Sequence, residues 1–294
     1  MSEPRFYFVV VDIDPTLAED AGVLFFELGA TGVEERDQTT LVKGPSGKTS
    51  LVASFNSREE AESARDQVDA SWSPRIEELV GDAWRDAWKE HFRPFEITPG
   101  IVVCPPWEKY AGSARYVLEL EPGRAFGTGL HETTSLVAGV LSDHRDTYRD
   151  GHVLDVGCGS GILALLALLL GAADARAIDN DPDVIDVARE NAERNHLEAR
   201  LTVDTTPVEQ ITSEYDMVLA NIEADVLIAL AAPISKCVKP GKLLVLSGVL
   251  ATQHDRVRAA YSDFEAPEAA QVGTGVRARG EWVALVLRRP LGSG

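Results

Sequence analysis

The chain has 294 residues, a hydrophobic fraction of 45% and a formal net charge of −19 at pH 7. This length exceeds that of a typical single domain, so we expect a main domain and a smaller accessory module. No stretch is as long and apolar as a membrane span, and the N-terminus has no secretory signal pattern. We therefore expect a monomeric, cytoplasmic protein that does not enter membranes.

The charge is strongly acidic, with 47 Asp and Glu residues against 28 Lys and Arg. Proteins that grip a phosphate backbone usually present a basic face, and no Lys/Arg run here supplies one, so we expect no direct nucleic-acid binding. A basic protein partner would be attracted by the same field. An acidic surface adapted to a saline cytoplasm is an equally good explanation of the composition, and the two are compatible.

Three cysteines, Cys104, Cys158 and Cys237, show no C-x-x-C spacing. This argues against a disulfide framework and against a structural zinc site, and we expect no bound metal. We predict that all three are reduced and buried.

The first 81 residues are predicted to form a substrate-recognition domain in which strands and helices alternate. The order β-α-β-β-α-β is ferredoxin-like. The expected elements are a strand over 6–13, a helix over 15–28, extended segments at 32–37 and 39–42, a strand over 50–55, a helix from the cap Ser57 to Val68, and a strand over 72–79.

Residues 82–124 are predicted to form a linker helix followed by an N-terminal extension of the main domain. The helix carries Trp84, Trp88 and Phe92, and several prolines then punctuate extended stretches. Trp84 and Trp88 lie four residues apart and so share one helical face, which favours a hydrophobic docking stripe over a ligand-stacking box.

From residue 125 to residue 294 strands and helices alternate, which predicts an α/β domain. The expected strands are 152–156, 173–179, 201–203, 217–221, 243–247 and 282–287, and the expected helices include 161–170 and 182–195. This alternation is typical of a doubly wound, mostly parallel, seven-stranded Rossmann-like sheet with helices on both faces. We predict that Asp181 caps the helix over 182–195; a capping role is the alternative for Asp179, which Asp181 fills better.

The turn after the first of these strands is rich in glycine. Gly157, Gly159 and Gly161 follow a G-x-G-x-G pattern, and residue 162 is Ile where the dinucleotide fingerprint G-x-G-x-x-G requires its third glycine. Asp155, just before the glycines, would repel a pyrophosphate but favour a ligand with an ammonium group. Asp179, at the end of the second strand, can accept hydrogen bonds from ribose hydroxyls. These features point to S-adenosylmethionine as the cofactor.

Several motifs together resemble the ribosomal protein L11 methyltransferase family, over nearly the whole chain. The most specific is Phe126-Gly-Thr-Gly-Leu-His-Glu-Thr-Thr134; the others are the glycine loop, Ala220-Asn-Ile222, the Trp84 to Pro94 segment, Leu246 to Gln253 and Glu281 to Leu285. The resemblance implies a Rossmann-like methyltransferase sheet.

The resemblance implies that Thr134, Gly157, Asp179 and Asn221 contact the cofactor. The cofactor-binding set that we predict also contains Asp155, Gly159, Gly161, Phe126, Gly127 and Thr128. We expect the amide of Asn221 to orient the cofactor or an incoming amine, although a turn residue that satisfies local backbone is the alternative.

Two further residues have competing interpretations. Thr134 has a helix cap as its alternative role. His131 has a pKa suited to a general base, but a structural hydrogen-bonding role is the more frequent one for such a residue.

The resemblance implies a protein-lysine N-methyltransferase that acts on lysine amines of ribosomal protein L11, with an N-terminal amine as a further candidate. One alternative is a methyltransferase of another protein. A second is a nucleic-acid base methyltransferase, which commonly has Asn/Asp-Pro-Pro-aromatic where this chain has Asn221-Ile-Glu-Ala. A third is a binding protein that retains the cofactor fold without turnover.

Overall fold

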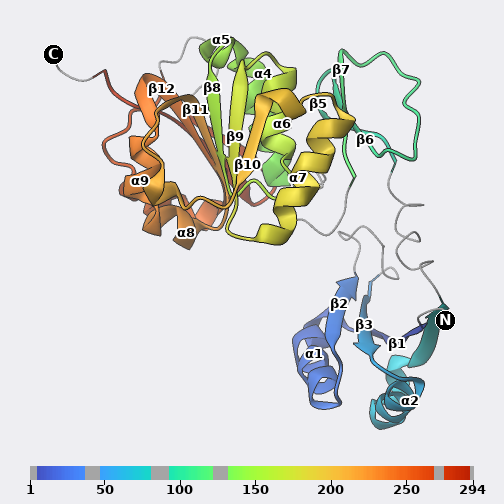
Figure 1. The fold of residues 1–294 in the computed structure, drawn as a ribbon. Coiled ribbons are helices and arrows are strands. Elements are labelled where there is room, and N and C mark those ends of the chain that lie inside the picture. The colour runs from blue at the N-terminus through green and yellow to red at the C-terminus, as the bar shows by residue number, and fades with distance from the viewer. Residues whose placement is uncertain (1–4, 37–46, 81–92, 122–131, 268–274, 292–294) are drawn as a thin grey trace. The chain divides into compact units, whose positions relative to one another are not determined.

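The computed structural model describes residues 5–36, 47–80, 93–121, 132–267 and 275–291. The chain divides into two compact units, residues 1–93 and residues 94–294, which are described separately below (Figure 1).

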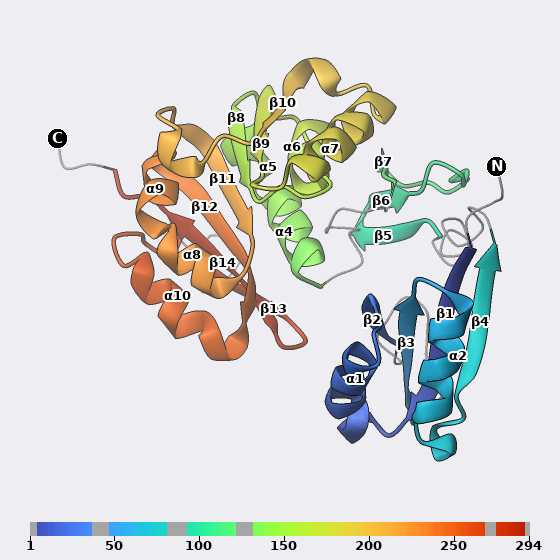
Figure 2. The ribbon, with the colours of Figure 1, turned by 60° about the horizontal axis from the view of Figure 1, so that its bottom comes forward.

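The first unit is a four-stranded antiparallel sheet with the strand order β2-β3-β1-β4. Its elements are β1 (Arg5–Ile13), η1 (Pro15–Leu17), α1 (Ala18–Glu27), β2 (Gly32–Arg36), β3 (Thr49–Phe55), α2 (Arg58–Gln67), η2 (Ala70–Trp72) and β4 (Arg75–Val80). Figure 2 shows α1 and α2 on one face of the sheet. Alternate residues of β1, Val9 and Val11, pack there against Phe25 and Ala61, as the period of two in a strand requires. Among the described residues of this unit, the elements follow the order β-α-β-β-α-β.

The predicted strand over 72–79 was wrong at its start. Asp69 accepts a hydrogen bond from the Ser71 amide at 2.8 Å and so caps a short 3-10 turn that ends at Trp72. Ser73 then takes a positive φ of 52°, which no strand residue adopts, and β4 begins only at Arg75. The predicted segment 39–42 and the linker residues Trp84, Trp88 and Phe92 lie outside the described residues.

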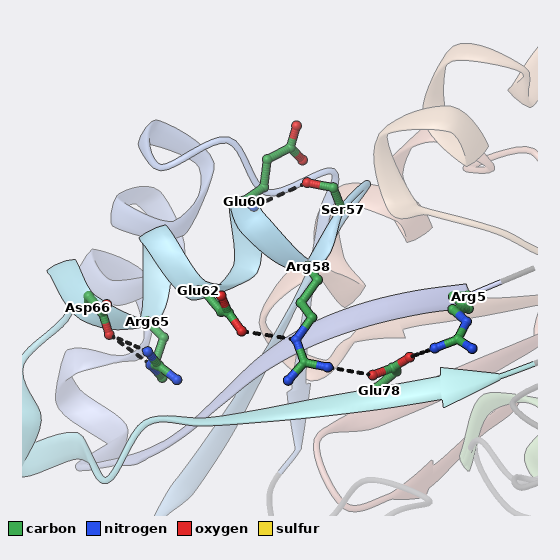
Figure 3. Close-up of polar contacts among 8 residues, drawn as sticks. All are labelled: Arg5, Ser57, Arg58, Glu60, Glu62, Arg65, Asp66 and Glu78. Atoms are coloured by element: carbon green, nitrogen blue, oxygen red, sulfur yellow. Dashed lines mark hydrogen bonds and ion pairs between the residues drawn. The ribbon is translucent and has the colours of Figure 1, made fainter.

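Polar contacts fix the start of α2 (Figure 3). Ser57 is the N-cap, as predicted, and its hydroxyl accepts a hydrogen bond from the Glu60 amide at 3.1 Å. Arg58 pairs with Glu62 one turn later and with Glu78 on β4. Because these ion pairs are exposed, solvent screens them, and the cap is the stronger local determinant of where the helix begins.

The second unit contains the predicted doubly wound sheet of seven strands. Its strand order is β10 (Leu201–Asp204), β9 (Asp174–Ile178), β8 (His152–Val156), β11 (Tyr215–Asn221), β12 (Val238–Leu250), β14 (Trp282–Arg288) and β13 (Val276–Arg279). The first five are parallel, and β14 runs antiparallel to both of its neighbours.

Helices cover both faces of this sheet (Figures 1 and 2). One core cluster contains residues of α4 (Glu132–Asp143), α6 (Ile162–Leu169) and α7 (Pro182–Arg194); the other contains residues of α8 (Ala224–Ala229), α9 (Ala231–Lys236) and α10 (His254–Ala260). Strand β11 shows why. Met217 and Leu219 belong to the first cluster, whereas Val218 and Ala220 belong to the second, so this strand is apolar throughout.

A three-stranded sheet precedes the large one in the chain and joins its core. It consists of β5 (Phe95–Thr98), β6 (Ile101–Cys104) and β7 (Tyr116–Glu119), which fall in the stretch predicted to be extended. Ile101 and Leu118 belong to the same buried cluster as α4 and α6. Residues 94–121 are therefore part of the second unit.

The three cysteines are free and buried, which confirms the prediction made for them. In the part of the chain that the structure describes, no helix is long and apolar enough to cross a bilayer. The same residues contain no cluster of His, Cys, Asp and Glu able to hold a metal ion.

Candidate functional site

The site lies where the order of the parallel strands reverses. From β8 the chain proceeds outward to β9 and β10, and it then returns to β11 on the other side of β8. Parallel α/β sheets bind ligands beyond the carboxyl ends of the strands at such a switch point. The residues that follow β8, β9, β10 and β11 all meet at this edge.

The glycine loop between β8 and α6 has a backbone that only glycine adopts readily. Gly157, Gly159 and Gly161 have φ values of 73°, 50° and 78°. A methyl group on Gly157 would lie 2.3 Å from the Cγ2 atom of Ile222, and one on Gly161 would lie 3.1 Å from the Cβ atom of Ala188. The glycines thus allow the loop to pack against the end of β11 and against α7.

A pocket of about 700 Å³ opens at this edge, a size typical of small-molecule sites. Five of the predicted residues line it: Thr134, Gly157, Gly159, Asp179 and Asn221. The other lining residues are Thr133, Val156, Cys158, Ile162, Leu163, Ile178, Asn180, Thr205, Thr206, Pro207, Val208, Glu209, Ile222, Glu223, Val226, Leu230, Gly248 and Trp282.

Two other predicted residues that the structure describes do not line this pocket. Gly161 is the N-cap of α6, two residues after Gly159, and Asp155 lies on β8 before the loop. The predicted residues Phe126, Gly127, Thr128 and His131 lie outside the described residues.

Asp179 is the carboxylate at the end of β9. One of its oxygens accepts the Gly159 amide at 2.9 Å, and the other accepts the Asp181 amide at 3.1 Å. A carboxylate has about four acceptor sites, so it retains capacity for two hydroxyl groups. Asp181 caps α7, as predicted, because its side chain accepts a hydrogen bond from the Asp183 amide at 2.9 Å. The capping role therefore does not compete for Asp179.

Asp155 is almost completely buried, with 1% of its surface exposed. One carboxylate oxygen accepts the Ala164 amide at 3.1 Å, and the other has no partner among the described residues. Burial raises the pKa of Asp155 to about 7, the charge of Asp179 adds to the rise, and the bond from Ala164 opposes it. A cation bound nearby would favour its ionised form.

Two polar atoms that border the pocket have no hydrogen-bond partner among the described residues: Oγ1 of Thr134 and Oδ1 of Asn221. Thr134 is fully buried and is the third residue of α4, so it is not the cap of that helix. Asn221 ends β11, and its amide oxygen accepts no hydrogen bond from the described backbone. Because buried polar atoms are almost always paired in native proteins, these two indicate a ligand with complementary polar groups.

Thr205, Thr206 and Glu209, which follow β10, were missed by the sequence reasoning. Arg176 on β9 forms a two-point ion pair with Asp204 and donates a further bond to the Thr206 hydroxyl at 3.0 Å. This fixes the loop against the pocket. The signal was present in the sequence, because β10 was predicted to end at the same sheet edge as β8 and β9.

Side chains of helix α7 hydrogen-bond both to the glycine loop and to the end of strand β7. The side chain of Asn191 donates to the Ser160 carbonyl at 3.0 Å and accepts the Glu121 amide at 3.1 Å. One turn later, Asn195 accepts the Glu119 amide and donates to the Glu119 carbonyl. These bonds hold the loop in one position, and nothing in the sequence pattern of α7 singled them out.

Comparison with known proteins agrees with this architecture. Residues 7–290 match the family model described as Ribosomal protein L11 methyltransferase. A protein of that name from Sorangium cellulosum is 50% identical, and the match covers 99% of this chain and 98% of the relative. One from Myxococcus xanthus is 36% identical, with 96% and 98% covered.

A solved structure shows the same likeness. The crystal structure of a ribosomal protein L11 methylase from Lactobacillus delbrueckii subsp. bulgaricus superposes with a TM-score of 0.59 at 26% identity. The match covers 68% of this chain and all of the solved one.

Proposed function

Since this chain belongs to the ribosomal protein L11 methyltransferase family, we propose that it methylates amines of ribosomal protein L11, with S-adenosylmethionine as the methyl donor. The observation that carries the proposal is the position of Asn221. Its amide oxygen has no partner among the described residues, and Asn221 lines a pocket beside the glycine loop, at the switch point of the sheet.

The described residues fit this donor. The pocket has the volume of a cofactor site, and Asp179 has acceptor capacity for the two ribose hydroxyls. We assign cofactor contacts to Thr134, Gly157, Gly159, Asp179 and Asn221. The glycine loop offers backbone amides without side chains in the way, and the unpaired Thr134 hydroxyl offers a further hydrogen bond.

We assign supporting roles to Asp155 and Gly161, which lie before the loop and at its end. From the sequence we further propose contacts from Phe126, Gly127 and Thr128. The role of His131 stays open between general base and structural residue.

The bound donor supplies a methyl group activated by a positively charged sulfur. The transfer is an in-line displacement, so the protein must hold the acceptor nitrogen in line and exclude water. Asn221 can accept a hydrogen bond from the amine and orient its lone pair. Apolar side chains around it, Ile222 and Trp282 among them, favour the neutral amine over the ammonium because they replace water.

A base-methylating activity is the weaker candidate. The residues after Asn221 are Ile222 and Glu223, so no aromatic ring follows it to stack a flipped base. The acidic composition also opposes nucleic acid. We further propose that the enzyme acts as a cytoplasmic monomer, and that the first unit recognises the protein substrate.

The proposed activity is tested with purified enzyme, labelled S-adenosylmethionine and ribosomal protein L11 whose lysines are replaced one at a time. We expect label in the wild-type substrate and loss of label when a target lysine is replaced. Each methyl group should add the mass of one CH₂ unit, about 14 Da. Label that is absent from wild-type L11 refutes the substrate assignment.

A further inference from the structure

An exposed carboxylate lines the pocket two residues after Asn221, the residue that we assign to the acceptor amine. Three carboxylates line the pocket in the described structure: Asp179, Glu209 and Glu223. Both oxygens of Asp179 already accept backbone amides. Glu209 and Glu223 are both exposed, and neither side chain makes a hydrogen bond or ion pair with any described residue. Of the two, Glu223 is the one that lies two residues from Asn221. Its charge is thus available to a cation that approaches the pocket.

The backbone around Glu223 is held firmly by the residue before it. Ile222 packs closely against two glycines, Gly157 after β8 and Gly248 near the end of β12. A methyl group on Gly157 would lie 2.3 Å from the Cγ2 atom of Ile222, and one on Gly248 would lie 2.4 Å from its carbonyl oxygen. Both glycines have positive φ values, 73° and 81°. Asn221 on one side of Ile222 and Glu223 on the other therefore have fixed positions, with Cα atoms at most about 7 Å apart along the chain.

Apolar residues line the pocket together with Glu223. They include Ile222, Val226, Leu230 and Trp282, and Val226 is 41% exposed although it is a large hydrophobic residue. A lysine side chain has a complementary form, with an apolar four-carbon stem that ends in a compact charge. Apolar side chains beside an unpaired carboxylate suit such a group better than they suit an anion or a planar base.

We propose that Glu223 is a specificity-determining residue that captures the ammonium form of the acceptor lysine at the pocket, before the amine reaches Asn221. The proposal rests on the proposed function. Glu223 attracts the cation, Ile222 and Val226 contact its stem, and the proton leaves to solvent as the amine passes inward. The carboxylate thus affects acceptor binding, and the orientation by Asn221 affects the transfer itself.

Asp225 provides a matched control. It lies two residues further on, at the start of the same helix α8, and it carries the same charge. It does not line the pocket, and it pairs with Arg256 at 2.9 Å. Neutralising it changes the net charge of the chain as much as neutralising Glu223 does, but it leaves the pocket lining unaltered.

The test compares wild type, Glu223→Gln and Asp225→Asn with L11 and S-adenosylmethionine as substrates. We expect Glu223→Gln to raise KM for L11 about two- to fivefold, the effect of one exposed ion pair, and to weaken the salt dependence of KM. We expect its kcat and its calorimetric affinity for S-adenosylmethionine to stay at the wild-type values. Asp225→Asn should match wild type in all four quantities.

Three outcomes would overturn the inference. An unchanged KM in Glu223→Gln, with wild-type turnover intact, refutes the role of Glu223 and leaves the proposed function standing. An equal rise of KM in Asp225→Asn shows that only net charge matters. No turnover by wild type, with donor binding retained, refutes the proposed function and the Glu223 role with it.

Discussion

Replacing Gly157 by alanine tests how the glycine loop is fitted to the end of β11. Alanine at a φ of 73° costs about 1–2 kcal/mol, because its Cβ approaches the backbone in that conformation. The new methyl group would also lie 2.3 Å from the Cγ2 atom of Ile222, where ordinary contact begins at 3.4 Å. Overpacking of this kind costs about 1–3 kcal/mol. We expect Gly157→Ala to lower the free energy of unfolding by about 2–5 kcal/mol in all.

The two contributions can be separated with Ile222→Ala. This change removes the Cγ2 atom, and the Cβ atom that remains is 3.8 Å from the added methyl group, an ordinary contact. The double variant should therefore recover the steric part, about 1–3 kcal/mol, but not the part due to φ. Urea unfolding of wild type, both single variants and the double variant gives the coupling energy, and calorimetry with S-adenosylmethionine reports on the pocket. Additive effects in the double variant would refute the steric reasoning.

Four further outcomes follow from particular residues. Ser57→Ala should destabilise the first unit by about 1 kcal/mol in urea unfolding, and Ser57→Asp should not, because aspartate also caps. Asp179→Ala should weaken calorimetric binding of S-adenosylmethionine about tenfold or more, and unchanged affinity would contradict the ribose assignment. Burial acts to raise the pKa of Asp216, but hydrogen bonds, the strongest from Lys239, lower it to about 2. The free energy of unfolding should therefore fall as the pH drops from about 4 towards 2, and Asp216→Asn should not show this fall. The pKa of Asp155 is raised, so its effect has the opposite sign: the free energy of unfolding should decline as the pH rises from about 4 to about 7. If Asp155→Asn shows the same decline over that range as wild type, this prediction is wrong.

Local patterns in the sequence predicted most of the second unit. The strand 152–156 was predicted with its observed bounds, and helix α7 was predicted with its cap Asp181, because apolar runs and capping residues act within a few positions of one another. The short strand β13 was not predicted. The strand that became β12 was predicted only over 243–247, since Pro240 and Gly241 interrupt its pattern.

The amino-acid sequence by itself determined the doubly wound sheet, the glycine loop and the carboxylate that follows the second strand. Each of these depends on residues that are close together in the chain, where the hydrophobic periodicity, the glycine positions and the helix-capping residues can be recognised. Only the tertiary structure decided which distant residues complete the pocket. Trp282 and Gly248 reach it because β12 and β14 place one of their ends at the same sheet edge. That Glu223 has no side-chain partner among the described residues likewise depends on how distant segments pack.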